Sequence, residues 1–147
     1  MTSFKSSIST VLVLASFLAH SVPSSAARQE LKSPDGLTVV SISDEGNRAT
    51  YSVSYNGKDF ILPSPLGLNT NIGNFVNNLV MTGSSDVESV SDSYSLPNIK
   101  KSHVDYKANK QVFTFGRDGK KIFDVIFEVS DNNVAFRYRL HPQGETL

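Results

Sequence analysis

The sequence of 147 residues contains no cysteine, no tryptophan and no Asn-x-Ser/Thr sequon. Without cysteine no disulfide can hold the domain together, so its stability must come from an apolar core or from a covering domain. Without a sequon no N-linked glycan is expected. The 14 Lys and Arg residues are balanced by 14 Asp and Glu residues, and they form no basic run or stripe. Nucleic acid is therefore not an expected partner.

Long apolar runs are also missing. The run Val11–Ala19 (VLVLASFLA) is shorter than the roughly 20 residues that cross a bilayer, and no longer run follows it, so no membrane span is expected. Lys5 precedes this run and the small residues Ser25–Ala27 follow it, which is the order of a secretory signal peptide. We expect residues 1–27 to be a cleaved signal peptide, residues 28–147 to be one domain, and the protein to be secreted or extracytoplasmic. The alternative interpretation of the apolar run is a buried helix of the fold.

The rest of the chain has the pattern of short β-strands. No helical periodicity is sustained for ten residues, and apolar and polar residues alternate between frequent turn signals. This pattern predicts an all-β fold, an antiparallel β-sandwich. The expected strands cover residues 37–43, 49–55, 66–70, 79–82, 86–94, 102–107, 111–116, 123–129 and 134–140, with a loop at 69–78 and a turn at 108–110.

Three hairpins have turns whose chemistry predicts a register. Asn56–Gly57 is typical of a type I′ turn, which needs positive φ at both central residues. A two-residue turn there would place Val53 opposite Phe60 and Tyr51 opposite Leu62, with the apolar side chains on one face.

The second and third hairpins follow each other near the end of the chain. For the turn at Asp118–Gly119 we expect a three-residue loop with Gly119 in the left-handed conformation, because this loop keeps the aromatic residues of both strands on one face. For the last hairpin, a turn at Asn132–Asn133 would place Phe127 opposite Tyr138. The same register would place Glu128 opposite Arg137.

Three segments, in this order, resemble one enzyme family: Leu31–Leu37 (LKSPDGL), Tyr51–Leu68 (YSVSYNGKDFILPSPLGL) and Phe123–Leu140 (FDVIFEVSDNNVAFRYRL). The pattern is similar to the N-terminal domain of glycoside hydrolase family 97, a family of α-glucosidases and α-galactosidases. The resemblance implies a galactose-mutarotase-like β-sandwich that packs against a (β/α)₈ barrel, which carries the catalytic carboxylates. It also implies a calcium ion in the full-length family, held mainly by glutamates of the barrel.

The sequence departs from the family pattern in two places. It ends at Leu147, part-way through the sandwich domain and before the barrel, so the sandwich is expected to be incomplete and the catalytic residues to be absent. The section Ser91–Lys110 lacks the tryptophan-containing stretch that the family has there, so the resemblance does not support a sugar contact from this section.

Acidic residues are the first candidates for chemistry, because glycoside hydrolysis usually needs two carboxylates about 5–10 Å apart. Most acidic residues here lie in turns or on polar strand faces. Asp124 and Glu128 share a strand face but lie about 13 Å apart along it, which is too far for either glycosidase geometry. We therefore expect structural roles and assign no catalytic residue, the alternative being a carboxylate pair.

Neither the histidines nor the remaining acidic residues have the spacing of a metal or cofactor site. His103 and His141 have no metal-ligand spacing, and a zinc site needs three or four ligands, so no metal site is assigned. Composition alone leaves a Ser-His-Asp triad open, although no G-x-S-x-G motif supports it. The run 84–92 lacks the glycine and the terminal glutamate of a calcium loop, so a solvated edge strand is expected there. No cofactor-binding residue is assigned.

Aromatic residues can stack on sugar rings. Tyr94 and Tyr106 are the most plausible exposed ones. The others are more simply explained as core residues of a sandwich, which needs large side chains on two inner faces: Tyr51, Tyr55, Phe113, Phe115, Phe123, Phe127, Phe136 and Tyr138.

The function that the resemblance implies is a non-catalytic, carbohydrate-associated N-terminal domain of a secreted α-glycosidase. Its expected partners are the catalytic barrel and, in the full-length enzyme, an α-glucoside or α-galactoside. No cofactor is expected in this chain itself. The alternatives are a free-standing carbohydrate-binding module and a secreted interaction protein.

Overall fold

The computed structural model describes residues 26–95 and 103–143. These residues form eleven strands and one short 3₁₀ turn, and among them is no helix long and apolar enough to cross a membrane. The elements are β1 (Arg28–Lys32), β2 (Thr38–Ser43), η1 (Glu45–Asn47), β3 (Thr50–Tyr55), β4 (Lys58–Pro65), β5 (Leu68–Thr70), β6 (Gly73–Phe75), β7 (Val80–Ser84), β8 (Glu88–Ser95), β9 (His103–Arg117), β10 (Lys120–Ser130) and β11 (Asn133–Leu140).

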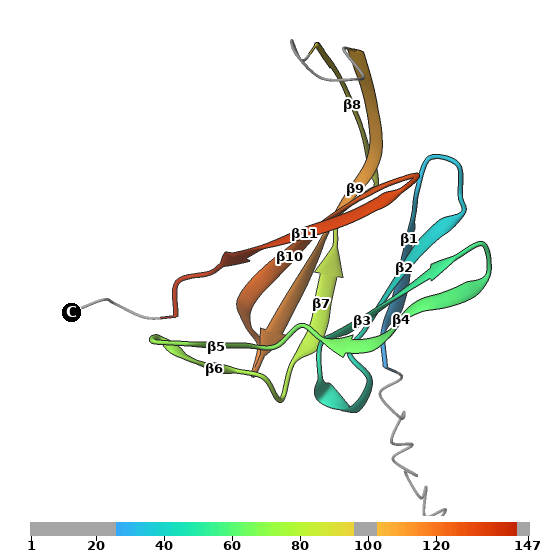
Figure 1. The fold of residues 1–147 in the computed structure, drawn as a ribbon. Coiled ribbons are helices and arrows are strands. Elements are labelled where there is room, and N and C mark those ends of the chain that lie inside the picture. Colours follow the sequence, from blue (N-terminus) through green and yellow to red (C-terminus); the bar gives the residue numbers. More distant parts are fainter. Residues whose placement is uncertain (1–25, 96–102, 144–147) are drawn as a thin grey trace, which may run out of the picture.

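The strands form two main antiparallel sheets, which pack face to face (Figure 1). The first sheet has the order β1-β2-β3-β4. The second has the order β11-β10-β9-β7, and β8 pairs with the part of β9 that extends beyond the body. A small hairpin, β5-β6, lies apart from both. The predicted all-β antiparallel sandwich is confirmed.

The core lies between the inner faces of the two sheets. Phe113, Phe115, Phe123 and Phe127 are fully buried and lie on neighbouring strands β9 and β10. The first sheet contributes smaller side chains to the same core cluster, Leu31, Val40, Ile42 and Val53. Alternate residues of β10 therefore point to the core, as the period of two requires. Two of the aromatic residues expected in the core, Tyr55 and Phe136, are instead exposed.

One predicted turn is wrong. Residues 108–110 lie in the middle of the 15-residue strand β9. Ala108 is 1% exposed because it has a strand partner on each side, Val90 of β8 and Ser130 of β10. The polar sequence around Asn109 favours a turn locally, but ladders on both sides keep the backbone extended.

The β3–β4 hairpin has the predicted turn but not the predicted register. Asn56 and Gly57 both have positive φ, as a type I′ turn requires. Two register shifts follow, so Val53 pairs with Ile61 and Tyr51 pairs with Ser64. A bulge inserts an extra residue into one strand of a pair, so the side chains beyond it point to the opposite face of the sheet. As a result Phe60 and Leu62, which were expected on the apolar face, are 79% and 69% exposed.

In the β9–β10 hairpin a bulge in β10 decides which side chains face the core. Its loop has two residues, not three, and both Asp118 and Gly119 have positive φ. The left-handed Gly119 is thus confirmed and the longer loop is wrong. A bulge between Lys121 and Phe123 provides the extra residue, so that Phe123 pairs with Phe115 on the core face.

The β10–β11 hairpin turns one residue earlier than predicted, at Asp131–Asn132. Phe127 therefore pairs with Phe136 and Glu128 with Ala135, two positions from the expected partners. The faces stay the same because the shift is an even number of residues. Asp131 is held in this turn by contacts with the β1–β2 turn: its Oδ1 accepts from the Asp35 N–H (2.9 Å) and its carbonyl from the Thr38 hydroxyl (3.2 Å).

A second contact between the sheets involves Asp44, which is buried at the end of β2. Its carboxylate accepts hydrogen bonds from the N–H groups of Ala27 (2.6 Å) and Met81 (2.8 Å). These bonds connect the start of the first sheet to β7 of the second. Buried carboxylates satisfied by backbone donors are typical structural residues.

Two strand regions were not predicted from the sequence. The strand β1 contains three charged residues in five, but Leu31 pairs with Val40 and is buried. The strand β6 lies within the expected loop at 69–78, where it pairs with β5, whose residues fall in the strand expected at 66–70. The expected signal peptide lies almost entirely outside the described residues and stays a prediction.

Candidate functional site

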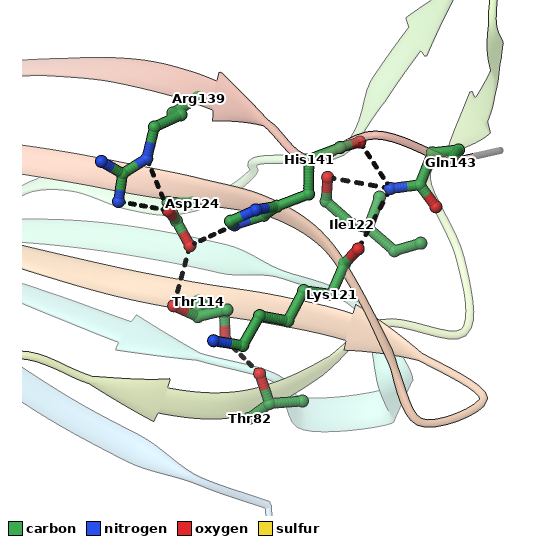
Figure 2. A network of polar contacts seen from close by, with 8 residues as sticks. All are labelled: Thr82, Thr114, Lys121, Ile122, Asp124, Arg139, His141 and Gln143. Atoms are coloured by element: carbon green, nitrogen blue, oxygen red, sulfur yellow. Dashed lines mark hydrogen bonds and ion pairs between the residues drawn. The ribbon is translucent and has the colours of Figure 1, made fainter. Parts of the chain in front are cut away.

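The most connected polar group in the described residues is Asp124, on the outer face of β10 (Figure 2). Its side chain is only 3% exposed. The strand register places it directly opposite Arg139 of β11. Arg139 contacts Oδ2 with both Nε (2.8 Å) and Nη2 (2.6 Å), and the Thr114 hydroxyl donates to Oδ1 (2.8 Å). His141 Nε2 lies 3.0 Å from Oδ1, without the alignment of a hydrogen bond.

The groups around Asp124 determine the pKa of its carboxyl. Burial alone would raise the pKa of the carboxyl, but the contacts with His141, Thr114 and Arg139 outweigh it and hold the pKa below its usual value. Asp124 is therefore a permanent carboxylate at neutral pH. A general acid of a glycosidase needs the opposite, a carboxyl whose pKa is raised.

The same network fixes the chain after β11. The His141 N–H donates to the Ile122 carbonyl (2.9 Å), and Gln143 Nε2 donates to the carbonyl of Lys121 (3.0 Å) (Figure 2). Both carbonyls belong to the bulge of β10. The arrangement holds the end of β11 in place and leaves the carboxylate of Asp124 almost inaccessible to solvent. The sequence predicted a structural role for Asp124 but not its partners, although an aspartate within an apolar run opposite an arginine is a usable signal.

Glu128, the predicted companion of Asp124 on this face, has a different partner. Its Oε1 accepts a hydrogen bond from the Tyr106 hydroxyl at 2.8 Å. The structure does not bring the two carboxylates together. In the described ranges, no group of three or more His, Asp or Glu side chains could hold a metal ion.

The residue types of a triad do meet, at the free end of the β8–β9 ribbon. His103 Nδ1 lies 3.4 Å from the Ser95 hydroxyl, and His103 Nε2 lies 3.2 Å from Asp105 Oδ1. The side chains of His103 and Asp105 are 59% and 69% exposed. A working triad needs a buried, orienting aspartate and donors for an oxyanion, and an exposed two-stranded ribbon provides neither. We interpret the cluster as solvated surface.

The two tyrosines predicted to be exposed lie on this same ribbon, and on one face of it. Asp92 pairs with Tyr106 and Tyr94 pairs with Val104, so all four side chains share a face. Tyr94 is exposed and Tyr106 is half-buried. Burial, and then the hydrogen bond to Glu128, raises the pKa of Tyr106 to about 12. Tyr106 is therefore a neutral phenol whose ring is held in place.

A third feature is an apolar opening on one side of the sandwich, which we call the open side. It lies between β4 and β11, the strands at the ends of their sheets. Here the rings of Tyr51 and Phe136 lie 5.3 Å apart, and the Tyr138 hydroxyl donates to the Leu66 carbonyl (3.1 Å). A cavity of about 460 Å³ lies at one end, lined by apolar residues including Ile61 and Val134 and rimmed by the turn residues 131–133.

Comparisons with known proteins agree with the fold. A family model described as "Glycosyl-hydrolase 97 N-terminal" matches residues 31–146. A "Probable retaining alpha-galactosidase" of Streptomyces bingchenggensis (strain BCW-1) is 34% identical over 95 residues, which are 65% of this chain and 15% of that protein.

Solved structures give the same picture. A beta-arabinopyranosidase crystal structure matches with a TM-score of 0.71 and 44% identity, over 79% of this chain and 18% of that one. A glycoside hydrolase family 97 enzyme from Pseudoalteromonas sp. strain K8, in complex with acarbose, matches with a TM-score of 0.70 and 28% identity, over 78% and 18%. A variant of that enzyme was solved with panose. The chain thus spans less than a fifth of the length of these relatives.

Proposed function

Because this chain belongs to the glycosyl-hydrolase 97 N-terminal family, we propose that it is the non-catalytic sandwich domain of a secreted α-glycosidase. In that enzyme it packs on the catalytic barrel and helps to shape the sugar pocket. The length of the relatives supports this proposal, since each contains several times more chain than the part matched here. The calcium ion that the resemblance implies would be held mainly outside this chain.

The open side is the observation that carries the proposal. Phe60 and Leu62 of β4 are more exposed than any other large apolar residues described, Phe60 lines the cavity, and Phe136 and Leu140 of β11 are exposed as well. Contiguous exposed apolar surface on a soluble domain usually marks an interface. The two strands that border it, β4 and β11, also have a neighbour on only one side among the described strands. An adjoining part of the same enzyme would cover both the apolar side chains and the free strand edges.

The coding sequence tests this proposal most directly. We expect the reading frame to continue past the codon for Leu147 and to encode a (β/α)₈ barrel with paired carboxylates. Sequencing the transcript measures this. A stop codon directly after Leu147 would contradict the role as a buttress and leave the alternatives.

The chain alone should not hydrolyse glycosides. Within residues 26–95 and 103–143 the one deeply buried outer-face carboxylate, Asp124, is bound by arginine, and Glu128 is bound by tyrosine. We expect no release of nitrophenol from nitrophenyl α-glucoside or α-galactoside above the rate in buffer, with a full-length family enzyme as the positive control. Turnover that follows the purified chain through chromatography would show that it contains catalytic groups of its own.

The alternatives are a free-standing carbohydrate-binding module and a secreted interaction protein. The two tyrosines of the β8–β9 ribbon favour the first of these, since the exposed Tyr94 and the half-buried Tyr106 share one face. Binding of sugar by the chain alone distinguishes this module from a purely structural domain.

A further inference from the structure

The buried residue Asp44 holds the residue that precedes β1. The Ala27 N–H donates to Asp44 Oδ1 at 2.6 Å, and the Ala27 carbonyl accepts from the Asp44 N–H at 3.2 Å. These two bonds continue the β1–β2 ladder by one residue beyond the pair Arg28 and Ser43. Ala27 is half-buried, whereas Ala26 before it is exposed. The hydrogen-bonded part of the first sheet therefore includes Ala27, which the sequence assigns to the signal peptide.

We infer that the signal peptide is removed between Ala26 and Ala27, one residue earlier than the sequence indicates, and that the new α-ammonium of Ala27 forms an ion pair with Asp44. Hydrolysis of this peptide bond consumes one water, leaves a carboxylate on Ala26 and frees the amino group of Ala27, which is mostly protonated at neutral pH. Ser24 and Ala26 are small residues at the positions that signal peptide cleavage requires. The inference rests on the secretion that we propose, and it names the bond that is cleaved.

The geometry favours this bond because the Ala27 nitrogen already lies at the distance of an ion pair from Asp44 Oδ1. A charged donor makes such a contact roughly twice as strong as a neutral amide does. Asp44 is 8% exposed, so salt screens the pair little. Cleavage after Ala27 would instead remove both of its bonds to Asp44 and take a donor away from a buried carboxylate, which is costly. The other carboxylate oxygen accepts from the Met81 N–H at 2.8 Å, so the ion pair would join the start of the mature chain to β7.

The charged side chains at this end of the first sheet have other partners or face solvent. The Arg28 guanidinium donates to a serine hydroxyl of β2 (3.3 Å), and Arg48 Nε donates to an asparagine side chain (3.0 Å). Glu45, which follows Asp44 in the chain, is exposed. The strand β7 on the other side of Asp44 carries no charged residue. None of these groups changes its charge between pH 6 and 10, so a change in stability over that range would report the α-amino group.

The first measurement is the intact mass and the N-terminal sequence of the protein after a bacterial host has secreted it through its own signal peptide. We expect one mature chain that starts at Ala27. A chain that starts at Arg28, or a cut upstream of Ala26, would overturn the inference and leave the proposed secretion unaffected. A signal peptide that stays uncleaved would overturn the inference and contradict secretion as well. The proposed buttress role is tested separately by the transcript.

The ion pair is tested on the chain from Ala27 to Leu147, released from a tag that leaves no extra residue, with its Nα-acetylated form as the matched control. The acetylated chain keeps the N–H donor and loses only the charge. We expect the free chain to unfold about 3–6 °C higher at about pH 6.5. An ion pair raises the pKa of the α-amino group above its ordinary value of about 7.7–8.0. The difference should therefore be complete below that ordinary value and be lost as pH rises through the raised one.

A variant of the carboxylate shows whether the charge acts through Asp44. Asp44→Asn should remove the difference between the free and the acetylated chain, whereas Asp86→Asn, at an exposed carboxylate, should leave it unchanged. The comparison remains valid if Asp44→Asn destabilises both forms, because the readout is a difference between them. Equal unfolding temperatures of the free and acetylated chains would overturn the ion pair, and so would a difference that persists in Asp44→Asn.

Discussion

Replacing Phe127 with alanine should cost the domain roughly 3–5 kcal/mol of unfolding free energy, the usual range for a buried phenylalanine. Phe127 is fully buried on β10 at the centre of the core. Its ring lies 6.0 Å from that of Phe113, 5.8 Å from Tyr51 and 5.1 Å from Phe136. The substitution therefore removes both buried area and aromatic pairing on three sides.

Because a domain of this size is stable by only about 5–15 kcal/mol, the loss would remove a large part of its stability. Urea unfolding followed by circular dichroism measures it. Phe60→Ala is the matched control, since this ring is 79% exposed, and should change stability by less than about 0.5 kcal/mol. If Phe127→Ala does not fold, Phe127→Leu should show a smaller loss in the same direction. Equal effects at positions 127 and 60 would contradict the assigned core.

The second large effect is expected at Asp124. Asp124→Asn should destabilise the domain by roughly 2–3 kcal/mol at neutral pH, because it weakens charge-assisted hydrogen bonds to a buried group. The cost stays below that of a fully buried ion pair because Arg139 is 61% exposed and regains water. Thermal unfolding of both proteins measures the difference.

The pH dependence of this difference has a definite sign. The folded protein lowers the pKa of Asp124 below the ordinary 3.8, so the carboxylate stabilises the fold at all pH values above that ordinary pKa. The contribution is lost as pH falls from 3.8 through the lowered value. The stability gap between the unsubstituted protein and the Asp124→Asn variant should thus narrow as the pH falls below 3.8. The exposed Asp59 provides the control Asp59→Asn, for which no gap is expected. A gap that stays the same or widens below pH 3.8 would contradict the assigned contacts.

Fold class could be predicted from the sequence because alternation and turn chemistry are local. Asn56–Gly57 and Gly119 adopt the positive φ that their sequences favour. Register failed beside Val53, where nothing local marks the bulge, and in the last hairpin, where the turn lies one residue earlier than predicted. In the β9–β10 hairpin the aromatic residues share a face as predicted, but a bulge and not a longer loop provides the extra residue. The turn predicted at residues 108–110 failed for the opposite reason, because strands distant in sequence hold Ala108 extended.

In the candidate sites, too, local features could be predicted from the sequence and contacts between distant strands could not. The sequence indicated that Tyr94 and Tyr106 were accessible, but only the ladder shows that they share a face with Asp92. The Asp124 network could not be predicted because its members come from β9, β10, β11 and the segment after β11. Its geometry depends on the β10–β11 register, which differs by two positions from the predicted register.

The topology also indicates which strands can pair early when the chain folds. Strands β1 to β4 pair only with neighbours in sequence, and the widest ladder partners among them, Thr38 and Tyr55, lie 17 residues apart. Strands β9 to β11 form a second meander of the same kind. Each can close its short loops at a small entropic cost. We expect the slow, non-local step to be the meeting of the two meanders, which the contact between Asp35 and Asp131 joins.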